Sequence, residues 1–175
     1  MTRRINVFIF TAAVILPFVA AGQSPVDFSG VWKMDAERSE SAHQAVPIGA
    51  VTLIIKQTAT ELSIETRRAE PNKSATRTEL LTYKLDGSET TTSGPDGASI
   101  KCRSHWEGDK LITGTTRSIQ GATVTTLYVH SLDPSGKELT VNKTLTVQHG
   151  YQFEGSKSYG SGTDVFIRTK GAVAK

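Results

Sequence analysis

The chain has 175 residues, of which 37% are hydrophobic and 21% charged, with a formal net charge of +3. This length fits one domain that buries enough surface to need no disulfide, and without its first 22 residues the chain carries 18 Lys and Arg against 17 Asp and Glu. That near-neutral balance argues against a nucleic-acid partner, which needs a clustered basic face, and gives no reason to expect electrostatic docking on anionic lipid.

The beginning of the chain predicts a secretory signal peptide. A positively charged start is followed by an apolar run over residues 7–21 and then by small residues. The run is shorter than the roughly 20 apolar residues that span a bilayer. We expect a leader over residues 1–22, cleaved after Ala21 or Gly22, and a domain over residues 23–175. That domain is expected to be exported, either periplasmic or secreted, with no stable membrane anchor; an uncleaved N-terminal anchor is the alternative.

The rest of the chain shows the pattern of short antiparallel strands. β-Branched and apolar residues recur at alternate positions, with Asn, Asp, Gly or Pro between the runs. We predict nine strands, some of them bent or split, over residues 28–34, 51–57, 61–67, 76–85, 99–106, 110–118, 123–132, 138–149 and 164–169.

Short links between these predicted strands favour pairing of sequential neighbours. Residues typical of tight turns stand between most of them, as at Asp86-Gly87 and Gly108-Asp109. A meander of antiparallel strands leaves two exposed edges unless it closes on itself. The sequence therefore predicts an all-β fold, an antiparallel up-and-down meander of eight to nine strands closed into a barrel.

Two segments lack a strand pattern. Residues 35–47 include the stretch from Ser39 to His43, which fits one helical turn, a loop that covers one mouth of the barrel, or a surface loop without fixed structure. Residues 155–162 are rich in Gly and Ser. We expect this second segment to be a flexible link before the last strand.

Alternate residues of a strand share one face, and this rule predicts the inner surface. The inward set comprises Phe28, Gly30, Trp32, Met34, Val51, Leu53, Ile55, Leu62, Ile64, Thr66, Leu81, Tyr83, Leu85, Ile100, Cys102, Ser104 and Trp106. Between residues 111 and 117 both faces carry polar groups, so either can face inward. Lys143 shares a face with Leu139 and Val141. It is therefore a cationic anchor for an acidic ligand, a side chain that snorkels to the rim, or a residue turned outward by a bulge.

Three short motifs carry a family resemblance. They are Phe28-Ser29-Gly30-Val31-Trp32-Lys33 followed by Asp35 and Arg38-Ser39, then Trp106-Glu107-Gly108-Asp109-Lys110-Leu111, and finally Val165-Phe166-Ile167-Arg168. With them the chain resembles the small exported lipocalin-like (calycin-like) β-barrel proteins. The resemblance implies that Trp32 packs at the closed end and that Arg168 lies across its ring, a cation–π contact worth about 0.5–2 kcal/mol. Other lipocalin motifs are not recognisable, so a calycin-like barrel is implied rather than a true lipocalin.

The sequence offers no constellation typical of catalysis or metal binding. Cys102-x-x-His105 is the only close pair of metal-type ligands, and on a strand these two residues point to opposite faces. Neither a Gly-x-Ser-x-Gly elbow nor a His-Glu-x-x-His motif occurs. We therefore predict no catalytic residue, no metal and no cofactor.

The predicted function is that of an exported module that binds a small apolar or amphipathic ligand inside its barrel. The predicted ligand-binding residues are Trp32, Tyr83, Cys102, Trp106 and Lys143. One alternative is a filled barrel with a structural or interaction role and no ligand. Another is a calycin-like enzyme, which needs an Asp, Glu or His in the lumen. A cavity of roughly 300 Å³ or more favours binding, whereas scattered small voids favour the filled core. The sequence predicts neither the identity of the ligand nor the oligomeric state.

Overall fold

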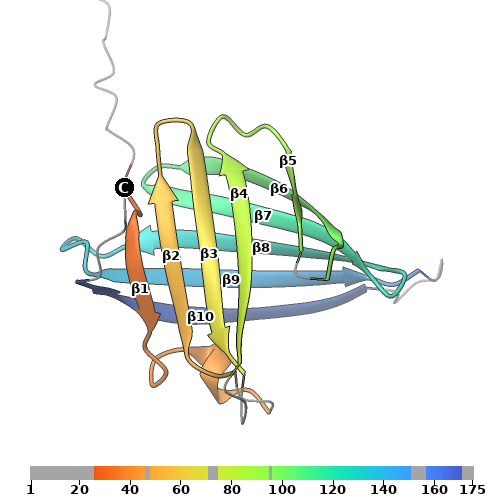
Figure 1. Cartoon of the computed structure of the whole chain (residues 1–175), viewed down its shortest axis with the longest axis horizontal. Helices are drawn as coiled ribbons and strands as arrows, with labels where there is room; N and C mark the ends of the chain where they lie inside the picture. The colour runs from red at the N-terminus through yellow and green to blue at the C-terminus, as the bar shows by residue number, and fades with distance from the viewer. Residues whose placement is uncertain (1–25, 46–47, 71–74, 95, 151–156, 171–175) are drawn as a thin grey trace, which may run out of the picture.

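A computed structural model describes residues 26–45, 48–70, 75–94, 96–150 and 157–170, so the predicted leader over residues 1–22 lies outside the described residues. The described residues form ten strands and one short 3₁₀ helix (Figure 1). Their bounds are β1 Gly30–Met34, η1 Glu40–His43, β2 Val51–Gln57, β3 Glu61–Ala69, β4 Thr76–Lys84, β5 Thr90–Ser93, β6 Ser99–Glu107, β7 Lys110–Ile119, β8 Ala122–Leu132, β9 Glu138–Gln148 and β10 Lys157–Thr169. Within the described part of the chain, no helix is long and apolar enough to cross a membrane.

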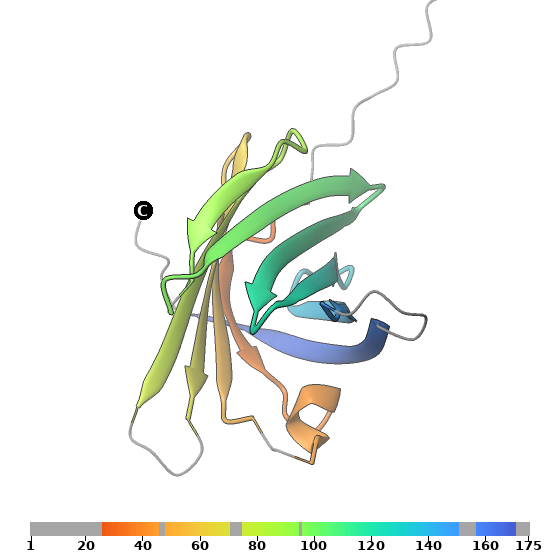
Figure 2. The ribbon, with the colours of Figure 1, turned by 90° about the vertical axis from the view of Figure 1, so that its right-hand side faces the viewer.

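The strands form a single antiparallel sheet in the order β4-β3-β2-β1-β10-β9-β8-β7-β6-β5. Every pair is sequential except β1 with β10, where Trp32 lies opposite Arg168. The sheet curls so that β1 to β4 cross in front of β7 to β10 at a steep angle (Figures 1 and 2). This confirms the predicted all-β meander in a barrel, with ten strands instead of eight or nine.

The barrel is nearly closed where its two edge strands, β4 and β5, approach each other. No strand ladder joins them in the pairing of the described residues. Instead, the Thr90 hydroxyl donates to the carbonyl oxygen of Thr82 at 2.5 Å. The Ser104 hydroxyl of β6 donates to the carbonyl oxygen of Lys84 at 2.9 Å. Side chains therefore hold this seam together where backbone pairing is lacking.

Two segments differ from the sequence prediction. Strand β5 was not predicted, because Thr-Thr-Thr-Ser shows no alternation of apolar and polar residues. The expectation of a flexible link over residues 155–162 is wrong for residues 157–162, which begin β10. Gly160 lies opposite Leu145 and Ser161 opposite Thr144, so pairing with β9 orders this Gly- and Ser-rich stretch without apolar side chains of its own.

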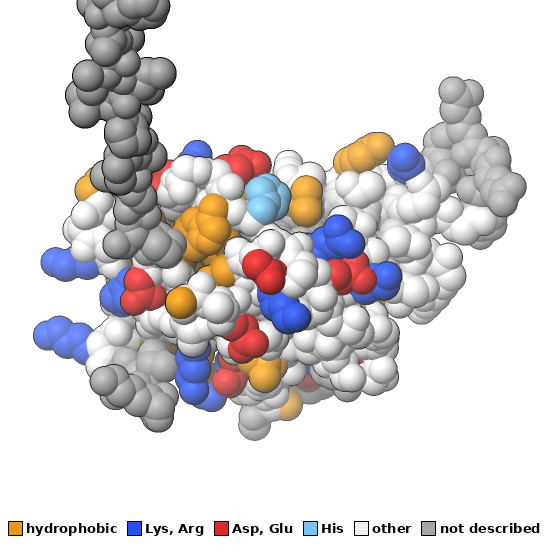
Figure 3. Space-filling view, turned by 90° about the horizontal axis from the view of Figure 1, so that it is seen from above, with side chains coloured by type: hydrophobic (Ala, Val, Ile, Leu, Met, Phe, Trp, Pro, Cys, Tyr) orange, Lys and Arg blue, Asp and Glu red, His pale blue; other side chains and the backbone are white. Residues whose placement is uncertain are grey.

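The core follows the predicted faces. Its largest fully buried side chains include Trp32, Tyr83, Phe28, Ile55, Leu62, Ile100, Leu111 and Leu139. On β7 the inward face is that of Leu111, Thr113 and Thr115, all almost completely buried, which settles the ambiguity between residues 111 and 117. The outer face seen in Figure 3 carries Lys and Arg interspersed with Asp and Glu. This arrangement, with one face exposed to solvent and one face packed in the core, is typical of an antiparallel sheet that closes on itself.

Candidate functional site: a cavity inside the barrel

The closed end of the barrel is built around Trp32. The Trp32 indole Nε1 donates to the carbonyl oxygen of Phe28 at 3.0 Å, and the Arg168 Cζ lies 4.2 Å from the centroid of the indole ring. The Arg168 guanidinium also donates to the carbonyl oxygens of Ser29, at 2.6 Å, and Gly136, at 2.7 Å. The structure thus contains the cation–π pair that the family resemblance implies, held in place by two charged hydrogen bonds.

The backbone and surroundings of Gly30 explain why the residue two positions before Trp32 is a glycine. Its φ of +152° lies in a region that other residues rarely adopt. A Cβ atom there would lie 2.9 Å from Arg168 Nη1 and 3.3 Å from Trp32 Nε1. The missing side chain therefore leaves the space through which the guanidinium reaches across the indole.

Beyond the closed end lies an inner cavity of about 130 Å³. Its apolar lining comes from both crossing layers of the sheet and comprises Met34, Ile48, Val51, Leu53, Ile64, Leu81, Val141 and Phe166. Polar groups line other parts of it, among them Tyr83, Thr113, His130 and Lys143. The cavity therefore offers a mainly apolar wall with polar groups at separate points, which is the usual character of a small-molecule pocket.

Two buried polar groups that line this cavity, His130 and Tyr83, are uncharged at neutral pH. His130 is 4% exposed, and its Nε2 lies 3.0 Å from the Thr113 hydroxyl. Burial lowers the pKa of His130 to about 4 and raises the pKa of Tyr83, because a desolvated site disfavours the charged form of either group. The wall beside these two groups thus accepts an apolar group without placing it against a charge of either one.

One side of the inner cavity is covered by η1, which is fastened to β10. The Ser39 hydroxyl donates to the carbonyl oxygen of Val165 and accepts from the Val165 amide. Ser41 donates to the Asp164 carboxylate twice, from its amide at 3.0 Å and from its hydroxyl at 2.6 Å. Figure 2 shows η1 beneath β10 at one end of the barrel. Of the possibilities for residues 35–47, the described residues 35–45 show the helical turn, which also covers one side of the cavity.

Lys143 points into the barrel. It lines the inner cavity, and its Nζ donates to the Ser41 hydroxyl at 3.4 Å. The register with β8 continues without interruption past Lys143, which lies opposite Tyr128. No bulge turns this lysine outward, so its ammonium group lies beside the anchored η1.

Arginines line a second hollow of about 240 Å³ that adjoins the inner cavity. The two share the lining residues Thr66, Arg68, Glu79 and Tyr128, and the second adds Arg77 and Arg117. An ion pair of 3.0 Å between Arg117 Nη1 and Glu79 Oε1 links β7 to β4 across the barrel. Burial raises the pKa of Tyr128, so its phenol stays protonated. We call this hollow, defined by its six lining residues, the arginine mouth.

Only part of the predicted ligand-binding set lines these spaces. Tyr83 and Lys143 do, whereas Trp32, Cys102 and Trp106 are not among the lining residues. The latter three belong to the packed core or lie against it, and the Trp106 ring centroid lies 6.0 Å from that of Phe28. The structure thus places them where they fill the barrel, and a role for them in ligand contact stays a prediction.

The candidate metal pair is divided as expected. Cys102 is buried, whereas His105 is exposed and lies 3.1 Å from Glu107 on the outside. Among the described residues, no group of three or more His, Cys, Asp or Glu side chains is placed to hold a metal ion.

His130 and Asp164 are inward titratable groups of the kind that an enzyme needs. His130 is neutral and bonded to Thr113, and both carboxylate oxygens of Asp164 accept hydrogen bonds from Ser41. Glu79 also lines the cavity and pairs with Arg117.

The prediction from the sequence missed several residues of the site. Arg117 shares its face with Leu111 and Thr113, so alternation marks it once that face is known to be the inner one. Arg68 lies just past the predicted end of its strand, which extends to Ala69. Glu79 lies two residues before Leu81 on β4, so the alternation rule was sufficient to place it inside.

No protein-family model and no curated protein matches the chain. Among solved structures, a protein described as the REP1-NXSQ fatty acid transporter is similar at a TM-score of 0.50 and 17% identity, covering 83% of this chain and 98% of its own. Apo lipid binding protein 8 of Caenorhabditis elegans is similar at 0.50 and 14%, covering 81% and 95%. The chain shares the β-barrel fold of these two proteins. At these identities the likeness concerns the fold alone, and it agrees with the calycin-like architecture implied by the motifs.

Proposed function

We propose that the protein binds one small amphipathic molecule inside its barrel. The observation that carries this proposal is the adjacency of two unlike spaces, an inner cavity with a mainly apolar wall and an arginine mouth that shares four of its lining residues. An apolar chain fits the first and a polar end fits the second. The names of the two similar proteins, a fatty acid transporter and a lipid binding protein, support the same class of ligand.

The size of the spaces bears on the alternative of a filled barrel. Neither the inner cavity of about 130 Å³ nor the arginine mouth of about 240 Å³ alone reaches the roughly 300 Å³ that favours ligand binding. They share four lining residues, however, and this adjacency supports one binding region over the scattered voids of a filled core. A ligand that occupies both has the room that a small amphiphile needs.

The proposal is tested by filling the inner cavity from within. Leu81 is buried and lines the cavity, whereas its neighbour Leu80 on β4 is 50% exposed on the outside. We expect the wild-type protein to bind the fluorophore 1-anilinonaphthalene-8-sulfonate saturably with one site, and decanoate to displace it. Leu81→Trp should weaken both ligands at least tenfold, and Leu80→Trp should leave them within twofold.

Thermal unfolding of both variants shows whether Leu81→Trp folds, and Val141→Phe gives a second way to fill the same cavity. Failure of the wild-type protein to bind either ligand would overturn the proposal. Equal binding by folded Leu81→Trp and Leu80→Trp proteins would do the same, because the ligand would then lie elsewhere.

We also propose that the protein acts after export. The charged start, the apolar run over residues 7–21 and the small residues after it support this setting. The intact mass of the protein isolated from its source tests it. A chain that begins at Gly22 or Gln23 is expected, and a chain that retains residues 1–21 would contradict cleavage.

A further inference from the structure

Among the described residues, two exposed arginines lie opposite each other in the arginine mouth without a partner of opposite charge. Arg68 of β3 and Arg77 of β4 are directly opposed in the antiparallel register, and both line the same hollow. Like charges directly opposite on neighbouring strands destabilise a sheet. Among the described residues, no hydrogen bond or ion pair joins either guanidinium to an acidic group. The pair is therefore an arrangement that a bound anion would stabilise.

A third arginine reaches the same hollow from the opposite side of the barrel. Arg117 of β7 lines it and pairs with Glu79 of β4 at 3.0 Å. Three guanidinium groups and one carboxylate give the arginine mouth a formal charge of +2, although the chain beyond the predicted leader is nearly neutral. On the outer surface, by contrast, Glu89 pairs with both Lys101 and Arg103.

We propose that the arginine mouth binds the dianionic head group of an amphiphile, a phosphate monoester rather than a carboxylate. This inference rests on the proposed function, because the apolar chain of that amphiphile occupies the inner cavity. It deepens that function by assigning the chemical class of the ligand's polar end.

The charge and the geometry of the donors both favour phosphate. A phosphate monoester carries a charge of about −1.5 to −2 near neutral pH and has three strongly accepting oxygens. It matches the formal charge of +2 in the mouth, whereas a carboxylate leaves one guanidinium uncompensated. Arginine presents a planar fork of donors that fits phosphate oxygens in pairs. The protonated Tyr128 phenol supplies a further donor and adds no negative charge.

The position of the mouth directs the rest of the ligand inward. Thr66 and Tyr128 line both the arginine mouth and the inner cavity. A head group held between β3, β4 and β7 thus has its alkyl chain next to the apolar wall that includes Leu81 and Val141. His130 and Tyr83, which line the inner cavity, are neutral. They therefore suit the alkyl chain of the ligand better than a second charged group.

The test compares ligands that differ only in their head group. Isothermal titration of the purified protein at pH 7.5 uses decyl phosphate, decanoate, decanol and inorganic phosphate. We expect decyl phosphate to bind at least tenfold more tightly than decanoate. Inorganic phosphate is expected to bind at least a hundredfold more weakly than decyl phosphate. At pH 5, where the monoester carries close to one charge, decyl phosphate itself should bind at least threefold more weakly than at pH 7.5.

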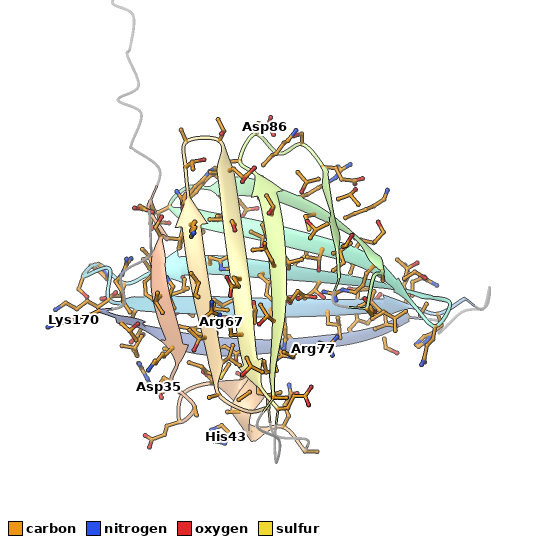
Figure 4. All side chains as sticks on the ribbon, viewed as in Figure 1. Asp35, His43, Arg67, Arg77, Asp86 and Lys170 are labelled. Atoms are coloured by element: carbon orange, nitrogen blue, oxygen red, sulfur yellow. The ribbon has the colours of Figure 1, made fainter. Side chains whose placement is uncertain are left out.

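Matched variants locate the effect. The double variant Arg68→Gln/Arg77→Gln should lose the preference for decyl phosphate and bind decanol as the wild type does. Arg67→Gln is the control, because Arg67 is the neighbour of Arg68 on β3 and pairs with Glu65 instead; Arg67 and Arg77 are both labelled in Figure 4. This control should retain the full preference.

The outcomes separate the two proposals. If neither decanol, decanoate nor decyl phosphate binds, the proposed function itself is wrong. If decanoate binds as tightly as decyl phosphate, or if the double variant keeps the preference, the proposed function stands and the phosphate inference is wrong. Inorganic phosphate that binds as tightly as decyl phosphate would also overturn it, because the mouth would then recognise free phosphate and not the head group of an amphiphile.

Discussion

Acidification should destabilise the protein through one buried side chain, His130. Burial sets the pKa of the folded protein's His130 at about 4, against 6.5 for an ordinary histidine. Between these two values the unfolded chain takes up a proton that the folded chain does not, so stability falls as the pH falls from 6.5 towards 4. At about 1.4 kcal/mol for each pKa unit, the full loss is about 3 kcal/mol, most of it reached by pH 4.5.

Urea unfolding followed by tryptophan fluorescence at pH 7 and pH 4.5 measures this loss. The matched variant is His130→Gln, which has no titrating ring and should lose less than about 1 kcal/mol over the same interval. Carboxylates contribute mainly at lower pH; Asp133, for example, has its pKa lowered to about 2 from 3.8, so the stability it adds disappears only below pH 4. An equal loss in the wild type and in the variant would refute the reasoning, because a different group would then bind the proton.

Three further changes test the closed end and the anchored helix. Arg168→Met should lower the free energy of urea unfolding by about 2–4 kcal/mol, since it removes the cation–π contact and the donors to Ser29 and Gly136; a loss below 1 kcal/mol would contradict that role. Gly30→Ala should lower the same free energy by about 1–3 kcal/mol because of its φ of +152° and the nearby guanidinium, and an unchanged unfolding midpoint would show that the space is not needed. Ser41→Ala should speed amide hydrogen exchange in η1 while β1 stays protected, because both its hydroxyl bonds are lost; equal exchange in both proteins would show that η1 is held otherwise.

The fold could be predicted because its evidence is local. Alternation over five to ten residues is enough to assign a strand and its faces, and the short turns fix which strands pair. Trp32, Gly30 and Arg168 could likewise be predicted from short motifs, since the closed end depends on a few residues with little freedom. Strand β5 was missed because its four polar residues satisfy the ladder through their backbone alone.

The arginine mouth could not be predicted in the same way. Arg68 and Arg117 are separated by 49 positions in the printed sequence and come together only through the curl of the sheet. Net charge also conceals the feature, because a nearly neutral chain can still concentrate +2 in one hollow. For Trp106 the alternation rule predicted the correct face but not the correct role. The side chain packs against the core and lines neither hollow.

The central claim is that an amphipathic molecule lies inside the barrel, and one measurement tests it most directly. Backbone amide NMR spectra recorded during a titration with decanoate should show saturation at one molecule per chain. The largest shifts are expected at Thr66, Leu81, Tyr128 and Val141, which line the spaces, and the smallest at outward residues such as Glu107. Shifts that grow without saturation, or that concentrate on the outer face, would contradict the account.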